Sequence, residues 1–216
     1  MNISPVFSII KNFIFPKRCP YCNKLIKVTE YACNSCMDKF PFTYIDGFTK
    51  GGFICVSSFP YEDIFKNAIL NIKFKSKTAY APQVAVTMVR DINDCYKDKN
   101  FDFITSVPLH KKRYRKRGFN QSKLLAENIS KQLKIPYIEA LVKVKNNKPQ
   151  HTIKGKERMS NVKNAYKVID KAIIKDKNIL IIDDIITTGY TLGECCKVLD
   201  KGGAKDVICA TFCRVI

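Results

Sequence analysis

The stretch that decides the fold runs from Ile179 to Thr191 and reads ILIIDDIITTGYT. Its four leading aliphatic residues show no polar alternation, which is typical of a strand covered on both faces in a parallel sheet. A hydroxyl-rich loop and a glycine follow the two carboxylates, and Leu192 to Leu199 has helix-like apolar spacing. We therefore predict a buried strand, a loop and a helix. The carboxylates then lie at the strand end, where open α/β sheets bind ligands.

The two carboxylates restrict the kind of ligand. Ionised Asp183 and Asp184 only accept hydrogen bonds, so hydroxyl donors or a hard cation such as Mg²⁺ are their natural partners. A vicinal diol suits both side chains. Because successive strand residues point to opposite faces, both can reach one ligand only if the chain is already leaving the strand at Asp184.

The loop after the carboxylates suits a phosphate. The first turn of a helix has unpaired backbone N–H groups with partial positive charge, and Thr187, Thr188 and Thr191 add hydroxyls. A sugar phosphate therefore fits the whole stretch. The alternative is a polar turn that merely caps a helix, but the length of the pattern favours a ligand site. An ordinary nucleoside triphosphatase is not indicated, because no Walker A lysine is near.

The same residues resemble the phosphoribosyl-diphosphate signature of type I phosphoribosyltransferases. The resemblance implies that Asp183 and Asp184 hold the ribose hydroxyls and that the threonine–glycine loop holds the 5′-phosphate.

Size and composition set broader limits. The 216 residues suffice for one α/β domain plus a small module, and the net charge of +19 favours polyanionic partners. Ten cysteines without a signal peptide predict a reduced, cytoplasmic protein. The apolar opening, Val6 to Phe15, is interrupted by Lys11 and is too short to span a membrane, so we expect a short docking helix there.

Four cysteines form two C-x2-C pairs separated by ten residues: Cys19, Cys22, Cys33 and Cys36. Two such pairs bring four thiolates to one tetrahedral point, which suits a structural Zn²⁺ with no open coordination position. Metal binding can contribute on the order of 10 kcal/mol to folding so short a segment. Free thiols and an iron–sulfur cluster are the alternatives. We place an N-terminal helix and zinc ribbon at 1–45 and the main domain at 46–216.

Apolar spacing predicts the remaining elements of the main domain. We expect helices at 62–74, 81–96 and 122–133, and strands at 53–59, 101–107, 138–142 and 206–212.

A basic run follows the strand at 101–107 and reads KKRYRKR, Lys111 to Arg117. A solvated basic turn is the simplest interpretation. Its position beside the predicted phosphate loop instead favours binding of a pyrophosphate or of a nucleic-acid backbone, with the tyrosine available for stacking. The candidate nucleic-acid-binding residues are Lys111, Lys112, Arg113, Tyr114, Arg115 and Lys116.

The segment from Lys145 to Lys163 is polar and strongly basic and has little to bury, so we expect a mobile loop. It contains Gln150 and Arg158.

Taken together, the four-cysteine ribbon, VPLH with the basic run and RGFNQ, the downstream PQ and ERMSNV, and DDIITTGYT are similar to the competence protein F (ComF, GntX-like) family. The resemblance implies a type I phosphoribosyltransferase fold, phosphoribosyl diphosphate with Mg²⁺ as ligand, and a link to DNA uptake in natural transformation. It also implies that Gly118, Asn120 and Gln121 line the site and that residues 150–161 close over the pyrophosphate. The candidate catalytic residues are Asp183, Asp184, Arg117 and Arg158. The candidate sugar-phosphate ligands are Asp183, Asp184, Thr187, Thr188, Gly189, Thr191 and Gln150.

The implied reaction is displacement at the anomeric carbon of phosphoribosyl diphosphate, with the departing pyrophosphate held by Mg²⁺ and cations. No residue is clearly committed to activating an acceptor, so the acceptor stays open. Three functions remain: a phosphoribosyltransferase-fold enzyme, a non-catalytic single-stranded DNA-binding competence factor, and an adaptor whose ribbon binds a protein of the DNA-uptake machinery.

Overall fold

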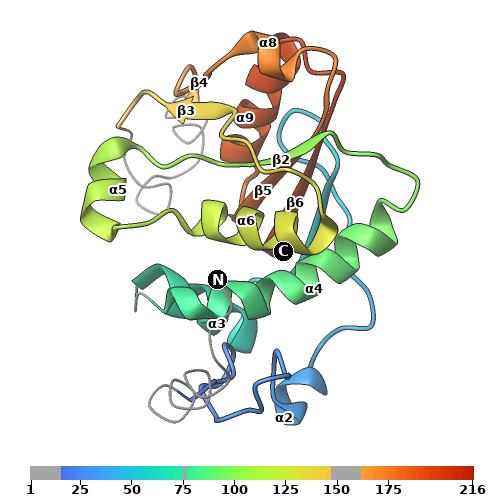
Figure 1. Ribbon diagram of the computed structural model, residues 1–216, viewed down its shortest axis with the longest axis vertical. Helices are drawn as coiled ribbons and strands as arrows, with labels where there is room; N and C mark the ends of the chain where they lie inside the picture. The colour runs from blue at the N-terminus through green and yellow to red at the C-terminus, as the bar shows by residue number, and fades with distance from the viewer. Residues whose placement is uncertain (1–15, 75–76, 147–161) are drawn as a thin grey trace, which may run out of the picture.

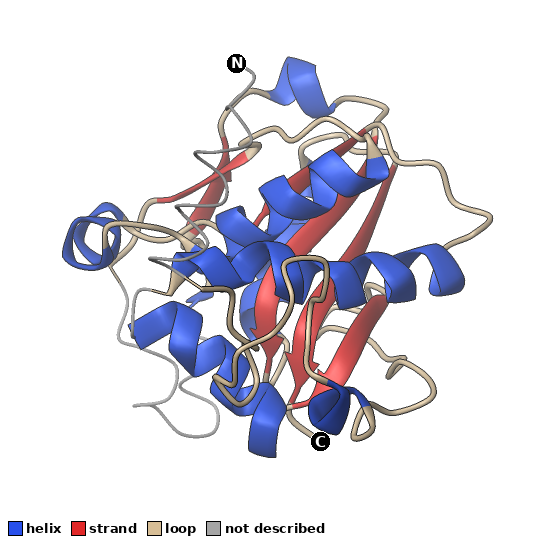
Figure 2. Ribbon diagram, turned by 60° about the horizontal axis from the view of Figure 1, so that its bottom comes forward, coloured by secondary structure: helices blue, strands red, loops and turns tan. Residues whose placement is uncertain are grey.

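The structure is a computed structural model that describes residues 16–74, 77–146 and 162–216. Its centre is a parallel sheet in the order β1-β6-β5-β2 (Figures 1 and 2). The strands span Cys55–Pro60 (β1), Asp206–Arg214 (β6), Asn178–Ile186 (β5) and Phe103–Ser106 (β2). The predicted strand in the decisive stretch is therefore confirmed as β5, and residues 179–184 of it are buried between two neighbouring strands.

Short segments extend the sheet at both edges. Ile45 pairs with Ser57 of β1, and the segment at Tyr137 pairs with Ile104 of β2. The predicted strand at 138–142 is wrong in its bounds. Ile138 donates to the carbonyl of Ile104, whereas β3 (Leu141–Lys143) leaves the sheet and pairs antiparallel with β4 (Tyr166–Val168). The start of the predicted strand therefore pairs with β2, and its end pairs with β4.

Helices cover both faces of the sheet (Figure 2). One face packs against α3 (Asp63–Phe74), α4 (Ala81–Cys95) and α6 (Gln121–Leu133). The other packs against α9 (Tyr190–Lys201), with α8 (Lys171–Ile174) and the β3–β4 pair beside it. The helices α3, α4, α6 and α9 confirm the expectations to within one or two residues, because each has the periodic apolar stripe that a sheet face requires. The short helix α8 was not predicted.

The basic run is a helix rather than a turn: α5 spans Lys111–Arg117. Its ends explain why a segment with no apolar stripe is helical. The ring of His110 accepts a hydrogen bond from the backbone N–H of Lys112 at 3.3 Å, and Gly118 ends the helix with φ 82°. The glycine is an ordinary carboxyl-terminal cap, whereas the histidine ring takes the place of the Ser, Thr, Asp or Asn that usually caps the amino end.

The cysteine segment shares its core with the sheet. Tyr21, which lies between two of the cysteines, is 2% exposed and packs among the rings of Phe59 of β1, Phe65 of α3 and Phe212 of β6. Phe40 joins the same cluster, 4.9 Å from Tyr21 between ring centroids. The segment is therefore docked on the α3 side of the sheet, and its short helix α2 (Asn34–Met37) is at the bottom of Figure 1.

No helix in the three described ranges is long and apolar enough to cross a membrane. The docking helix expected at Val6 to Phe15 lies outside the described residues.

Candidate functional site

The site begins where two neighbouring strands differ in length. β2 ends at Ser106, opposite Ile182 of β5, whereas β5 continues to Ile186. The edge of β5 on the β2 side is therefore open from Asp183 onward, at the carboxyl end of the sheet. Open α/β sheets bind ligands at such an edge.

The two carboxylates have different partners. The hydroxyl of Ser122, at the start of α6, donates to Asp183 Oδ1 at 2.6 Å, while Lys73, in the last turn of α3, forms an ion pair with Asp184. The expectation that the chain leaves the strand at Asp184 is wrong, because Ile185 and Ile186 still pair with β6. Since alternate strand residues point to opposite faces, the two carboxylates flank the open edge from either side of the sheet.

Burial controls the protonation of the first carboxylate. Asp183 is 8% exposed, and its burial, followed by the nearby charge of Asp184, raises its pKa to about 7. Hydrogen bonding from Ser122 and the charge of Lys73 act in the opposite direction. Asp183 therefore changes its charge near neutral pH, which is a property of many ligand-binding carboxylates.

The loop after β5 has the form expected of an anion site. Gly189 has φ 73° and precedes α9, and no side chain of the described residues caps the amino end of that helix. The hydroxyl of Thr188 is buried and has no hydrogen-bond partner among the described residues. Thr187 is exposed and Thr191 half-buried. An uncapped helix start beside an unpartnered hydroxyl leaves several donors for a phosphate.

Two glycines let the loop pack closely against another segment. A Cβ atom on Gly189 would lie 2.9 Å from the backbone nitrogen of Lys50, and one on Gly193 would lie 2.2 Å from the carbonyl oxygen of Lys50. The backbone of Thr49 and Lys50 thus packs directly against Gly189 of the loop and Gly193 of α9. Sequence reasoning missed this role of Gly193, although a glycine inside an amphipathic helix is a usable signal of close backbone contact.

A tyrosine and a lysine from the β3–β4 pair also face the site. Lys143 Nζ donates to the hydroxyl of Tyr166 at 3.1 Å, and the hydroxyl lies beside the side chain of Thr191. Desolvation by burial lowers the pKa of Lys143, and the charge of Asp183 opposes that shift. Neither Lys143 nor Tyr166 was predicted, because only the pairing of β3 with β4 brings them to the carboxylate.

The basic helix α5 lies near the same edge. Arg117 donates to Gln121, and the charge of Asp184 acts on the guanidinium. Asn120 is the amino-terminal cap of α6 and donates to the carbonyl of Val107, so it fixes α6 to the end of β2. Of the predicted lining residues, Arg117 therefore approaches a carboxylate, whereas Asn120 and Gln121 position their neighbours.

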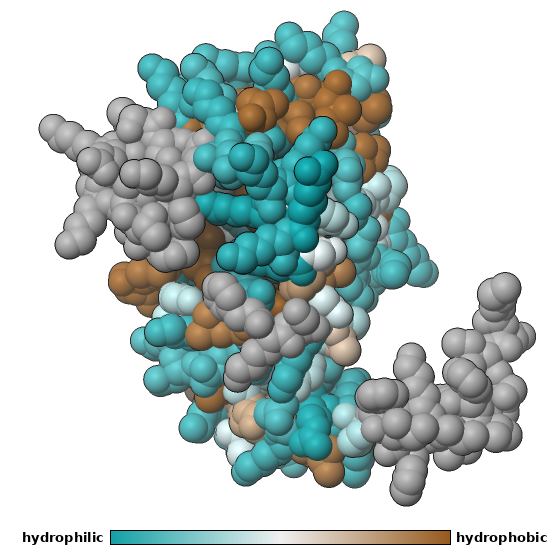
Figure 3. All heavy atoms as spheres, turned by 90° about the vertical axis from the view of Figure 1, so that its left-hand side faces the viewer, coloured by the Kyte–Doolittle hydropathy of each residue, from teal (hydrophilic) through white to brown (hydrophobic). Residues whose placement is uncertain are grey.

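The remaining side chains of α5 form a basic surface. None of its residues is buried, and Tyr114 is 48% exposed. Figure 3 shows the side of the molecule on which α5 lies in Figure 1, and hydrophilic side chains occupy much of its middle. A pocket of about 400 Å³ lies between α5 and the β3 strand. Its cationic and aromatic lining consists of Lys111, Tyr114, Arg115, Lys123, Tyr137 and Lys143.

Two predicted site residues, Gln150 and Arg158, lie outside the described residues, as does the rest of the segment expected to close over the pyrophosphate.

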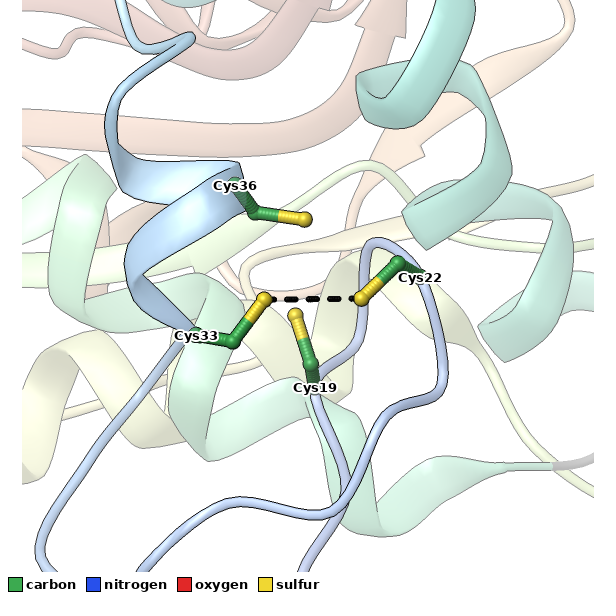
Figure 4. A group of neighbouring side chains, drawn as sticks. All are labelled: Cys19, Cys22, Cys33 and Cys36. Carbon is green, nitrogen blue, oxygen red and sulfur yellow. Dashed lines mark hydrogen bonds between the residues drawn. The ribbon is translucent and has the colours of Figure 1, made fainter.

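The four paired cysteines converge as predicted (Figure 4). The sulfur atoms of Cys19, Cys22, Cys33 and Cys36 all lie within 4.8 Å of one another, and those of Cys22 and Cys33 are 3.5 Å apart. A tetrahedral zinc–thiolate centre has sulfur atoms about 3.8 Å apart, so this cluster could hold a metal such as zinc. Four ligands leave no open position, and the metal would hold the ribbon together.

Comparison with known proteins gives the family context. Residues 120–216, which include β5, its loop and α9, match the phosphoribosyl transferase domain family. Competence protein F of Haemophilus influenzae is 28% identical over 204 residues, which cover 92% of this chain and 83% of that protein. The chain is thus similar to competence protein F over most of its length and to the phosphoribosyl transferase domain family over its second half. The DNA utilization protein YhgH of Escherichia coli K12 is 26% identical over 202 residues, which cover 92% of this chain and 84% of that protein. Competence protein ComFC of Bacillus subtilis 168 is 29% identical, over 73% of this chain and 63% of that protein. The matches to competence protein F and to YhgH extend well beyond residues 120–216, since each covers 92% of the chain.

Proposed function

We propose that this relative of competence protein F binds phosphoribosyl diphosphate with Mg²⁺ at the open edge of β5 and is linked to DNA uptake in natural transformation. The observation that carries the proposal is the direct succession of two buried carboxylates and a helix start at which, among the described residues, no side chain provides a cap and the Thr188 hydroxyl has no hydrogen-bond partner. A ribose phosphate has a diol and a phosphate in a matching arrangement.

Each group of the ligand has a partner. Asp183 and Asp184 lie on opposite faces of β5, but both flank its open edge, so a diol placed across that edge can donate one hydroxyl to each. The N–H groups at the start of α9 hold the 5′-phosphate. Arg117 and the lysines of α5 neutralise the pyrophosphate. Mg²⁺ bound with the ligand adds Lewis acidity toward the departing pyrophosphate. The protein itself holds the two ends of the sugar still, which is the main requirement for displacement at the anomeric carbon.

Calorimetry with phosphoribosyl diphosphate and Mg²⁺ tests the site. We expect wild-type protein to bind and D183N/D184N to lose binding, while D98N/D200N, which changes two exposed carboxylates, keeps it. A pyrophosphate-release assay on the same samples then tests for transfer or hydrolysis. Equal binding by both double variants would contradict the proposed site, and no binding by folded wild-type protein would contradict the proposed ligand.

A second candidate function, binding of single-stranded DNA, is favoured by α5. Six cations and an exposed tyrosine on one short helix suit a phosphate backbone and a stacking base. Two relatives also carry competence or DNA utilization in their names.

Salt dependence tests the DNA function. Each phosphate contact to a single strand contributes about 0.7 to the slope of log affinity against log salt, so K112A/R113A/R115A should reduce the slope by up to about 2. The control K97A/K131A/K175A removes three exposed charges elsewhere. An equal slope for the two triple variants would contradict a role for α5.

A further inference from the structure

Lys73 is paired with Asp184, one of the two carboxylates of the site. Its ammonium forms an ion pair with Asp184 Oδ2, and the side chains are 19% and 5% exposed, respectively. The two residues are far apart in the sequence and come from α3 and β5. The carboxylate is therefore almost completely buried, whereas the lysine side chain keeps some exposure to solvent.

The position of Lys73 is fixed through α3. On one side, the side-chain amide of Asn71 donates to the carbonyl of Pro20, next to Cys19, at 3.1 Å. On another side, the ring of Phe65 stacks on Phe59 of β1 with 4.1 Å between centroids. Contacts with the ribbon and with the sheet therefore hold the helix that delivers the lysine.

Two further cations, Arg117 and Lys143, reduce the negative charge felt around the aspartate pair. The charge of Asp184 acts on Arg117 in addition to its ion pair with Lys73, and Lys143 lies close enough to Asp183 for their charges to interact. A divalent cation bound by two carboxylates gains from an excess of negative charge, which these cations remove. An ammonium already in contact with one carboxylate also repels the metal directly.

We propose that Lys73 is the resident cation of the aspartate pair and excludes a bare divalent metal ion from Asp184, so that metal enters this site only with an anionic phosphate ligand. The nature of that ligand rests on the proposed function, whereas the exclusion of the bare metal does not.

Manganese binding to the full-length, zinc-loaded protein without any phosphate ligand tests this role. Electron paramagnetic resonance counts bound Mn²⁺, and the titration is repeated at several pH values between about 7 and 9 so that the comparison of variants does not depend on one protonation state. We expect wild-type protein to show no Mn²⁺ site that depends on Asp184. Lys73→Met should bind Mn²⁺ at least about tenfold more tightly than wild-type protein does, and adding Asp184→Asn to this variant should remove the gain.

Matched variants separate charge from other effects. Lys66→Met removes a lysine from the exposed side of the same helix and should gain nothing. Lys73→Arg keeps the charge and should keep the exclusion. Lys73→Gln offers a neutral hydrogen-bond donor to Asp184 and serves as the second neutral variant if Lys73→Met does not fold.

The possible results are distinct. An Asp184-dependent Mn²⁺ site in wild-type protein, or equal Mn²⁺ affinity in the neutral Lys73 variants and Lys66→Met, would overturn the proposal. Failure of phosphoribosyl diphosphate to bind wild-type protein would overturn the proposed function instead and would leave the Mn²⁺ result standing.

Discussion

Replacing Tyr21 by alanine tests how firmly the cysteine ribbon is joined to the sheet. The ring is 2% exposed and has Phe40, Phe59, Phe65 and Phe212 around it, with centroids 4.9 to 6.3 Å away. Three of these neighbours belong to β1, α3 and β6 rather than to the ribbon. The substitution therefore opens a cavity in a core that both parts share.

The expected loss follows from that burial. Truncating a buried aromatic residue to alanine costs about 3–5 kcal/mol. For a chain of this length, about 2–4 °C is lost per kcal/mol, so the melting temperature should fall by roughly 10 °C. Tyr21→Phe keeps the ring and should cost less than about 1 kcal/mol. Tyr31→Ala, at a half-buried position with a centroid 6.5 Å from Phe40, should cost less than half as much as Tyr21→Ala.

Calorimetric melting with excess zinc and with a chelator gives the measurement. Because the ribbon and the sheet share a core, we expect a single transition with zinc. The loss caused by chelation should also be smaller in Tyr21→Ala than in wild type, since both changes remove the same contacts. Two separate transitions, with the larger unaffected by Tyr21→Ala, would refute the shared core. Additive effects of chelation and substitution would refute the coupling.

Three further predictions concern the site. Burial and the neighbouring carboxylate raise the pKa of Asp183 to about 7. The stability contributed by its proton is therefore fully present below about pH 4 and is lost as pH rises through about 7. Asp183→Asn should lack this loss in a series of melts against pH, and parallel curves for the two proteins would contradict it. Ser122→Ala removes a donor to this carboxylate, so the pH midpoint of phosphoribosyl diphosphate binding should move upward in calorimetry; an unchanged midpoint would count against the role of the hydroxyl. Gly193→Ala would place a Cβ 2.2 Å from the carbonyl of Lys50 and should lower stability by about 2 kcal/mol in urea unfolding, and wild-type stability would show that this contact yields easily.

Much of the fold could be predicted because the sheet is formed from continuous apolar runs. The decisive stretch gave β5 and α9 to within two residues, and the cysteine spacing gave the convergent cluster. Both signals are local, so neighbouring residues suffice to read them.

The missed features depend on contacts between distant parts of the chain. Lys73 reaches Asp184 because α3 packs on one face of the sheet, whereas Ser122 reaches Asp183 because α6 begins beside the end of β2. No local pattern distinguishes Lys73 from other surface lysines. The helix α5 was missed for a different reason. Its caps, His110 and Gly118, determine its conformation, while the charge run between them carries no periodic signal.

The position of Tyr21 limits how this protein can be divided or recombined. The spacer between two metal ligands is usually free to vary, but here one of its two residues fills a socket lined by rings from β1, α3 and β6. Deleting the cysteine ribbon would leave that socket open to water. A ribbon expressed alone would expose the tyrosine. Exchange of ribbons between homologues should therefore succeed only when the tyrosine and its socket are transferred together.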